Sequence, residues 1–131
     1  MNDVEFIKAF ESGTFPATEF NHKAHIRLAW AYLDSFDEEI AIHRTCNAIK
    51  SFDILHGDGT KYHTTLTVAA VKVVHHFRQK SNASTFDGFV AEYPLLVSSF
   101  KDLLFQHYGE RVLANSKAKT TYLEPDLMPF S

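Results

Sequence analysis

Histidines stand at the start of two predicted helices, where their side chains could bind a metal ion or a small ligand. His22 and His25 follow Asn21, a residue type that often caps a helix, and their spacing puts both rings on one face of its first turn. His63 precedes a second apolar helical run. The positive end of a helix dipole favours neutral imidazole, which is also the form that binds metals. The sequence therefore predicts a polar site built on helix ends.

The first hypothesis is a metal-binding or metal-dependent protein of unknown reaction. Its ligands would be His22, His25 and His63, which suit a divalent transition metal of the zinc, iron or nickel class. Thr67 lies one turn after His63 and would support that histidine. A further ligand would come from one of three other side chains: His107, Asp102 or Glu19. No motif of known mechanism is present, so the sequence names no catalytic residue.

Two other hypotheses stay open. In the second, the same end of the molecule is a metal-free pocket for a small polar or anionic metabolite, bound by the backbone N–H groups of two helix starts. Lys23 and Lys61 would add positive charge, and His63 could act as an acid or a base. Hydroxyl groups would come from Thr60, Thr64 and Thr65. In the third, the histidines are structural and the protein is an interaction adaptor with an exposed apolar patch.

Composition removes several other classes of protein. The net charge is -3 and no stripe of Lys and Arg is present, so the electrostatic basis for binding nucleic acid is missing. No apolar run approaches the length of a membrane span, and the N-terminal segment lacks the pattern of a secretion signal. Cys46 is the only cysteine, which excludes an intramolecular disulfide and indicates a core thiol. We therefore expect a cytoplasmic protein that binds neither nucleic acid nor membrane.

Apolar residues recur at helical spacing along most of the chain. This pattern predicts an all-α, mainly antiparallel bundle of about five to seven helices in one domain, 1–131. The expected N-caps of the first four helices are Asn2 or Asp3, Asn21, Asp37 and Thr60. A fifth helix from Phe86 and a sixth from Pro94 to His107 should follow, then two short helical turns and an extended tail that contains Pro125 and Pro129.

The predicted helix directions bring the histidines together. Short connections make consecutive helices antiparallel, so the second, third and fourth helices should run up, down and up. His22, His25 and His63 then lie at one end of the bundle, beside His56 at the end of the third helix. His107 reaches the same end if the fifth and sixth helices run down together. The fourth helix is apolar almost all round and should occupy the middle of the bundle.

Four motifs, spread over nearly the whole chain, carry a resemblance. They are Phe20-x-His22-x-x-His25, Tyr62-His63-x-Thr65-x-Thr67, His107-Tyr108 and Pro125-Asp126-Leu127-x-Pro129. Together they resemble an uncharacterised family of small all-helical bacterial proteins. The resemblance implies that the recurrent polar positions are His22, His25, Tyr62, His63, Thr65, Thr67, His107, Tyr108 and Asp126, and all of these except Asp126 form our predicted ligand pocket. No activity follows from it. Thr64 stands where similar sequences often have Glu, and Gly109 where they often have Ser.

Overall fold

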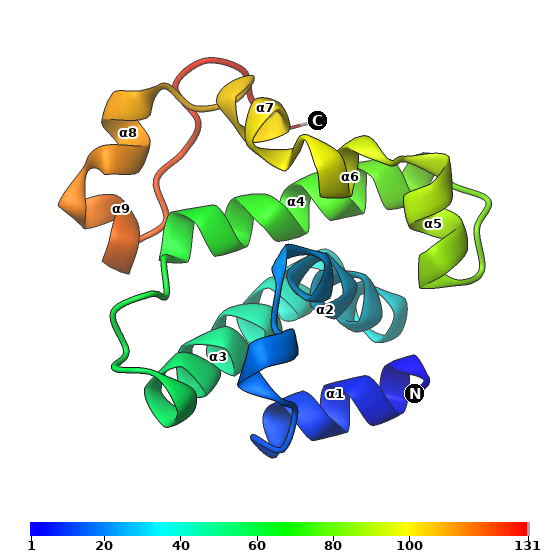
Figure 1. Cartoon of the computed structure of the whole chain (residues 1–131). Coiled ribbons are helices and arrows are strands. Elements are labelled where there is room, and N and C mark those ends of the chain that lie inside the picture. The colour runs from blue at the N-terminus through cyan, green and yellow to red at the C-terminus, as the bar shows by residue number, and fades with distance from the viewer. Residues whose placement is uncertain (131) are drawn as a thin grey trace.

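The chain is helical along most of its length in the computed structural model, which describes residues 1–130 (Figure 1). Nine α-helices and one 3-10 helix follow one another in that range, and no β-strand occurs in it. Their bounds are α1 Asp3–Glu11, η1 Ala17–Glu19, α2 His22–Ser35, α3 Glu38–His56, α4 Thr64–Lys80, α5 Phe86–Glu92, α6 Leu95–Ser98, α7 Phe100–Phe105, α8 Glu110–Ala114 and α9 Ser116–Thr120. The predicted all-α fold class is therefore confirmed, with more helices than the five to seven expected.

Three of the predicted helix starts are confirmed. The side chains of Asn2, Asn21 and Asp37 each accept a hydrogen bond from the backbone N–H three residues later, at 2.8 to 2.9 Å. Glu5 returns a hydrogen bond to the backbone N–H of Asn2, which completes a capping box. The Asn21 cap fixes the first turn of α2, and with it the positions of His22 and His25.

The start of α4 differs from the prediction. Thr60 does not cap the helix, because its hydroxyl and its backbone N–H both donate to the Asp58 carboxylate in a tight turn. His63 is the N-cap instead, since its Nδ1 accepts a hydrogen bond of 3.1 Å from the backbone N–H of Leu66. The helix therefore begins at Thr64, three residues later than predicted. This shift makes His63 part of the backbone hydrogen bonding of α4.

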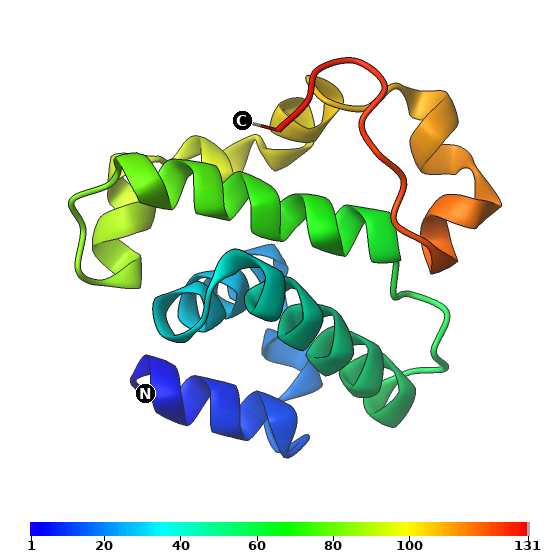
Figure 2. The ribbon, with the colours of Figure 1, turned by 180° about the vertical axis from the view of Figure 1, so that it is seen from behind.

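The central position of α4 is as predicted from its apolar sequence. It contacts α2, α3, α7 and α9, and both views show it crossing the middle of the molecule, with α3 running in the opposite direction (Figures 1 and 2). Its inward side chains are buried: Val68, Ala69, Val71, Val73 and Val74. Buried residues from α1 to α7 join in one core. Within residues 1–130, no helix combines the length and the apolarity needed to cross a membrane.

The chain after Pro94 forms short helices rather than the single long one we predicted. The break lies at Ser99, whose φ of -143° and ψ of 38° are not helical, so α6 and α7 are separate. In both views α5 lies near the end of α4, α6 and α7 follow α4 back, and α8 and α9 lie near its start. This returning segment covers the side of α4 that α2 and α3 leave open, and it closes one wall of the site described next.

Candidate ligand-binding cleft

A cleft of about 1160 Å³ opens between the starts of α2 and α4, the end of α3, and the returning helices α7 and α8. We call it the cleft. Most of its wall is apolar and combines aromatic side chains with small or aliphatic ones: Phe20, Ile26, Ala29, Ile49, Phe52, Leu66, Ala70, Val71, Phe100, Leu104 and Leu113. A concave, mainly apolar cavity with a few polar groups is the usual form of a small-molecule site.

Five of the eight predicted pocket residues line the cleft: His22, His25, Tyr62, His63 and Thr67. The topology therefore brings the three histidines of the metal hypothesis to one cavity. The other three predicted residues, Thr65, His107 and Tyr108, do not line it. Thr64, the position at which similar sequences often carry Glu, lines a separate small pocket and not the cleft.

His25 is the most unusual polar group of the cleft. Its ring packs on Phe20 with 4.1 Å between ring centroids, and it forms no hydrogen bond with the described part of the chain. Burial, helped by the nearby His22, lowers the pKa of His25 to about 4. The imidazole is therefore neutral at pH 7, and it offers one N–H donor and one nitrogen acceptor to whatever enters the cleft.

The other two histidines are held by backbone groups. The Nε2–H of His22 donates to the carbonyl oxygen of Leu96 at 2.9 Å, because a carbonyl can only accept. Since Nδ1 of His63 accepts from Leu66, the proton of this neutral ring sits on Nε2, which faces the Leu113 carbonyl at 3.4 Å. The Nδ1 atom of His63 is thus already occupied by a hydrogen bond. Its Nε2–H makes only a long contact, which a hydrogen bond to a ligand could replace.

The metal hypothesis gains no support from this geometry. Within residues 1–130, no group of three or more His, Cys, Asp or Glu side chains is arranged to hold a metal ion. Binding through Nδ1 of His63 would also break the cap of α4, which stabilises that helix start by about 1 kcal/mol. A metal site made of His22, His25 and His63 stays a prediction.

The remaining predicted residues hold the C-terminal tail, which we define as residues 121–130. The Thr65 hydroxyl donates to the carbonyl of Thr121 at 2.9 Å and accepts from the backbone N–H of Leu123 at 3.1 Å. The Tyr108 hydroxyl donates to the carbonyl of Leu123 at 2.8 Å, and the Asp126 carboxylate accepts from the backbone N–H of Gly109 at 2.8 Å. Thr65 and Tyr108 are fully buried. These residues are therefore anchors of the tail.

His107, which we expected near the other histidines, does not line the cleft with them. Its Nδ1 bonds with the carbonyl of Met128 at 2.8 Å, and its ring stacks on Phe130 with 4.2 Å between centroids. Its neighbours along the chain, Phe105 and Glu110, do line the cleft, but the His107 ring is held by the tail.

Sequence reasoning missed Asp53, a buried carboxylate in the cleft wall. One of its oxygens, Oδ2, accepts hydrogen bonds from the backbone N–H groups of Lys61 and Tyr62, at 2.8 and 2.9 Å. It thus holds the loop that leads to His63. An acid between Phe52 and Ile54 was a usable signal, because a buried carboxylate needs donors. His56, which we expected near this end, also lines the cleft and bonds with the Gly13 carbonyl at 2.8 Å.

The rim of the cleft combines balanced charges with exposed apolar groups. Lys61 and Lys101 contribute two positive charges, and Asp102 and Glu110 contribute two negative charges. Val97 and Phe105, which also line the cleft, are 36% and 43% exposed.

Comparison of the chain with protein-family models, with curated proteins and with solved structures found no match. The resemblance drawn from the four motifs therefore stays a prediction.

Proposed function

We propose that this protein binds a small, mainly apolar molecule in the cleft, without a metal, and holds one polar group of that molecule with His25. The observation that carries the proposal is a neutral imidazole without a hydrogen bond to the described chain, set in the wall of a large apolar cavity. A hydrogen bond between the ligand and a polar group in such surroundings adds more to the binding free energy than one to an exposed group. The reason is that the buried group gives up few hydrogen bonds to water when the ligand binds.

The chemistry of the wall defines the ligand class. Neutral imidazole can donate and accept at once, so a hydroxyl group, which does the same, is its best match. The rim carries as many negative as positive side chains, which gives a carboxylate or phosphate no clear electrostatic advantage. The exposed parts of Val97 and Phe105 would be covered by an apolar ligand body. A neutral molecule with one or two rings and a hydroxyl group fits these features.

Binding of 2-naphthol, followed by its fluorescence and by amide shifts in an NMR titration, tests the proposal. We expect the shifts to fall on cleft residues such as Ala29 and Leu113. Naphthalene, which lacks the hydroxyl, and 2-naphthoate, which is charged, should bind more weakly. In His25→Phe, which keeps a ring on Phe20, the affinity for 2-naphthol should fall about fivefold, as expected for one lost hydrogen bond.

The matched control is His75→Phe, since His75 lies on α4 outside the cleft and pairs with Glu38 at 3.9 Å. It should bind 2-naphthol like the wild type. Equal affinity of the His25→Phe and wild-type proteins would remove His25 from the site. Tighter binding of 2-naphthoate, strengthening as pH falls, would favour the anion hypothesis. Stoichiometric zinc binding that is lost in His22→Ala, His25→Ala and His63→Ala would favour the metal hypothesis instead.

A further inference from the structure

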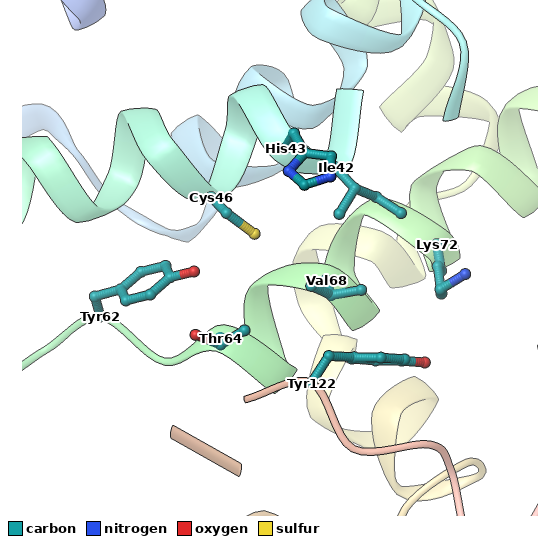
Figure 3. A pocket seen from close by; sticks show the side chains of 8 residues that line it. All are labelled: Ile42, His43, Cys46, Tyr62, Thr64, Val68, Lys72 and Tyr122. Atoms are coloured by element: carbon teal, nitrogen blue, oxygen red, sulfur yellow. The ribbon is translucent and has the colours of Figure 1, made fainter. Parts of the chain in front are cut away.

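A second, smaller pocket of about 400 Å³ lies between α3 and α4, apart from the cleft (Figure 3). Its side chains come from three parts of the chain: Ile42, His43 and Cys46 from α3, Tyr62, Thr64, Val68 and Lys72 from α4 and the loop before it, and Tyr122 from the tail. Thr64, Val68 and Lys72 are spaced by four residues, so they occupy successive turns on one face of α4. The pocket therefore has a long axis parallel to that helix.

One end of the pocket is polar and uncharged. The Tyr62 hydroxyl points towards the Cys46 thiol and the Thr64 hydroxyl (Figure 3). Burial, with the contact to Cys46, raises the pKa of Tyr62 to about 12, and burial also raises the pKa of the Cys46 thiol. All three groups are therefore protonated at neutral pH. They form a cluster of weak donors and acceptors that suits a neutral polar group.

The other end carries an ammonium group without a carboxylate partner. Lys72 is part-buried, and its Nζ lies 6.0 Å from the centroid of the Tyr122 ring. The ion pairs in the described part of the chain involve Arg27, His75 and Arg78, so Lys72 has none there. No Asp or Glu lines the pocket, and the carboxylates that act electrostatically on Tyr122, Glu38 and Glu124, lie outside it. This end therefore favours an anion, and the nearby aromatic face can pack against the body of a bound molecule.

The middle of the pocket is mainly apolar, and the His43 ring lies beside Ile42 there (Figure 3). Ile42 and Val68 lie between the two polar ends in Figure 3. Thr64 and Lys72 are eight residues apart on α4, which corresponds to about 12 Å along the helix axis. After a hydrogen bond is allowed at each end, this distance leaves room for about one aromatic ring.

We propose that this second pocket binds a small aromatic acid that carries a hydroxyl group opposite the acid. The carboxylate is held by Lys72, the ring lies between Ile42, Val68 and Tyr122, and the hydroxyl bonds with Tyr62 and Thr64. The proposal is independent of the function proposed for the cleft, since Tyr62 is the only lining residue that the two cavities share.

An NMR titration with 4-hydroxybenzoate tests this site. We expect amide shifts at Val68, Lys72 and Tyr122, with little change at Ala29 and Leu113 of the cleft. Two related compounds each lack one of the two polar groups of 4-hydroxybenzoate. 4-Hydroxybenzamide lacks the charge and should bind at least about tenfold more weakly, and benzoate lacks the hydroxyl and should bind about threefold more weakly.

Substitutions of the pocket residues test the same two contacts by changing the protein in place of the ligand. Lys72→Met keeps the aliphatic stem and should weaken 4-hydroxybenzoate binding about tenfold, and Thr64→Val should weaken it a few-fold. Lys80→Met, an exposed lysine at the end of α4, is the matched control and should bind like the wild type. Equal binding of the acid and the amide, an unchanged affinity in Lys72→Met, or shifts confined to the cleft would each overturn the proposal. The amide comparison uses the unaltered protein, so the result does not depend on the folding of a variant.

Discussion

The cleft histidines and the anchors of the C-terminal tail come from the same four sequence motifs, but they have different partners. Thr65 and Tyr108 are buried and form hydrogen bonds with backbone groups of the tail. His25 is neutral, packs on Phe20 and forms no hydrogen bond with residues 1–130. Polar residue types alone do not separate these two roles. Their hydrogen-bond partners do, because a satisfied group stabilises the fold and an unsatisfied one is available to a ligand.

The two regions are nevertheless connected through α8. Gly109, just before this helix, bonds with Asp126 of the tail, and Leu113 within the helix lines the cleft. The tail thus positions one wall of the cleft without touching a ligand there. Substitutions in the two regions should therefore separate stability from binding.

The largest effect is expected for Thr65→Val, which keeps the shape of the side chain but removes its hydroxyl. The backbone carbonyl of Thr121 and the backbone N–H of Leu123 would each lose their partner. We expect the free energy of unfolding to fall by about 2 to 4 kcal/mol, because two part-buried backbone groups are left unpaired. Urea denaturation measures this loss.

Thr120→Val serves as the control, since the Thr120 hydroxyl is exposed and makes only a 3.4 Å contact with its own helix. It should change stability by less than about 0.5 kcal/mol. A Thr65→Val protein as stable as this control would mean that the tail is not anchored as described.

The second prediction concerns acid and His25. Its pKa is about 4 in the folded protein and 6.5 in the unfolded chain, so between these values the unfolded chain binds a proton that the folded protein does not. The stability of the fold should therefore decrease as pH falls from 6.5 towards 4, by about 2 to 3 kcal/mol from this residue. Unfolding measured across this range in wild-type and His25→Phe proteins gives the contribution as a difference.

The variant is informative because the other acid-sensitive groups remain in both proteins. His76, whose pKa is also lowered, first by burial, is one of them. The His25→Phe protein should lose less stability than the wild type over this pH range. Parallel curves for the two proteins would show that His25 is already solvated, and the argument for its role in the cleft would fail with it.

The smallest effect is expected for Asp126→Ala. This exposed carboxylate accepts one hydrogen bond, from the backbone N–H of Gly109. Its loss should lower the free energy of unfolding by about 1 kcal/mol. Binding of 2-naphthol should change by less than about twofold when measured below the melting temperature, since Asp126 does not line the cleft. A large loss of binding with little loss of stability would place Asp126 in the site and remove the distinction between the two regions.

Much of the fold follows from local sequence. Asn2, Asn21 and Asp37 cap helices as their residue types predict, because a short polar side chain satisfies a backbone N–H that the helix leaves free. The apolar run of α4 predicted a central helix, since such a surface must be covered on several sides. The shared cavity of His22, His25 and His63 followed from helix order and short connections.

The errors arose where other groups, some of them close in sequence, take the hydrogen bonds or break the pattern on which a prediction rested. Thr60 has the residue type of a cap, but Asp58 takes its hydroxyl and N–H, and Asp53 takes the next two N–H groups. The sixth predicted helix has helical spacing throughout, but Ser99 interrupts it. His107 bonds with the tail. The turn at Asp58 is a local alternative to the cap that the prediction did not weigh, whereas the bond of His107 with Met128 joins residues 21 apart and depends on the folded chain.

The sequence by itself determined that this chain forms helices, where most of them begin, and which of them is central, because these depend on propensity, capping and apolar spacing along the chain. Only the tertiary structure decided which polar residues are already satisfied. Thr65 and Tyr108 meet backbone groups from a tail more than ten residues away, whereas His25 meets the ring of Phe20 and an open cavity. Hydrogen bonding and desolvation depend on what surrounds a group in space, and that arrangement exists only in the folded chain.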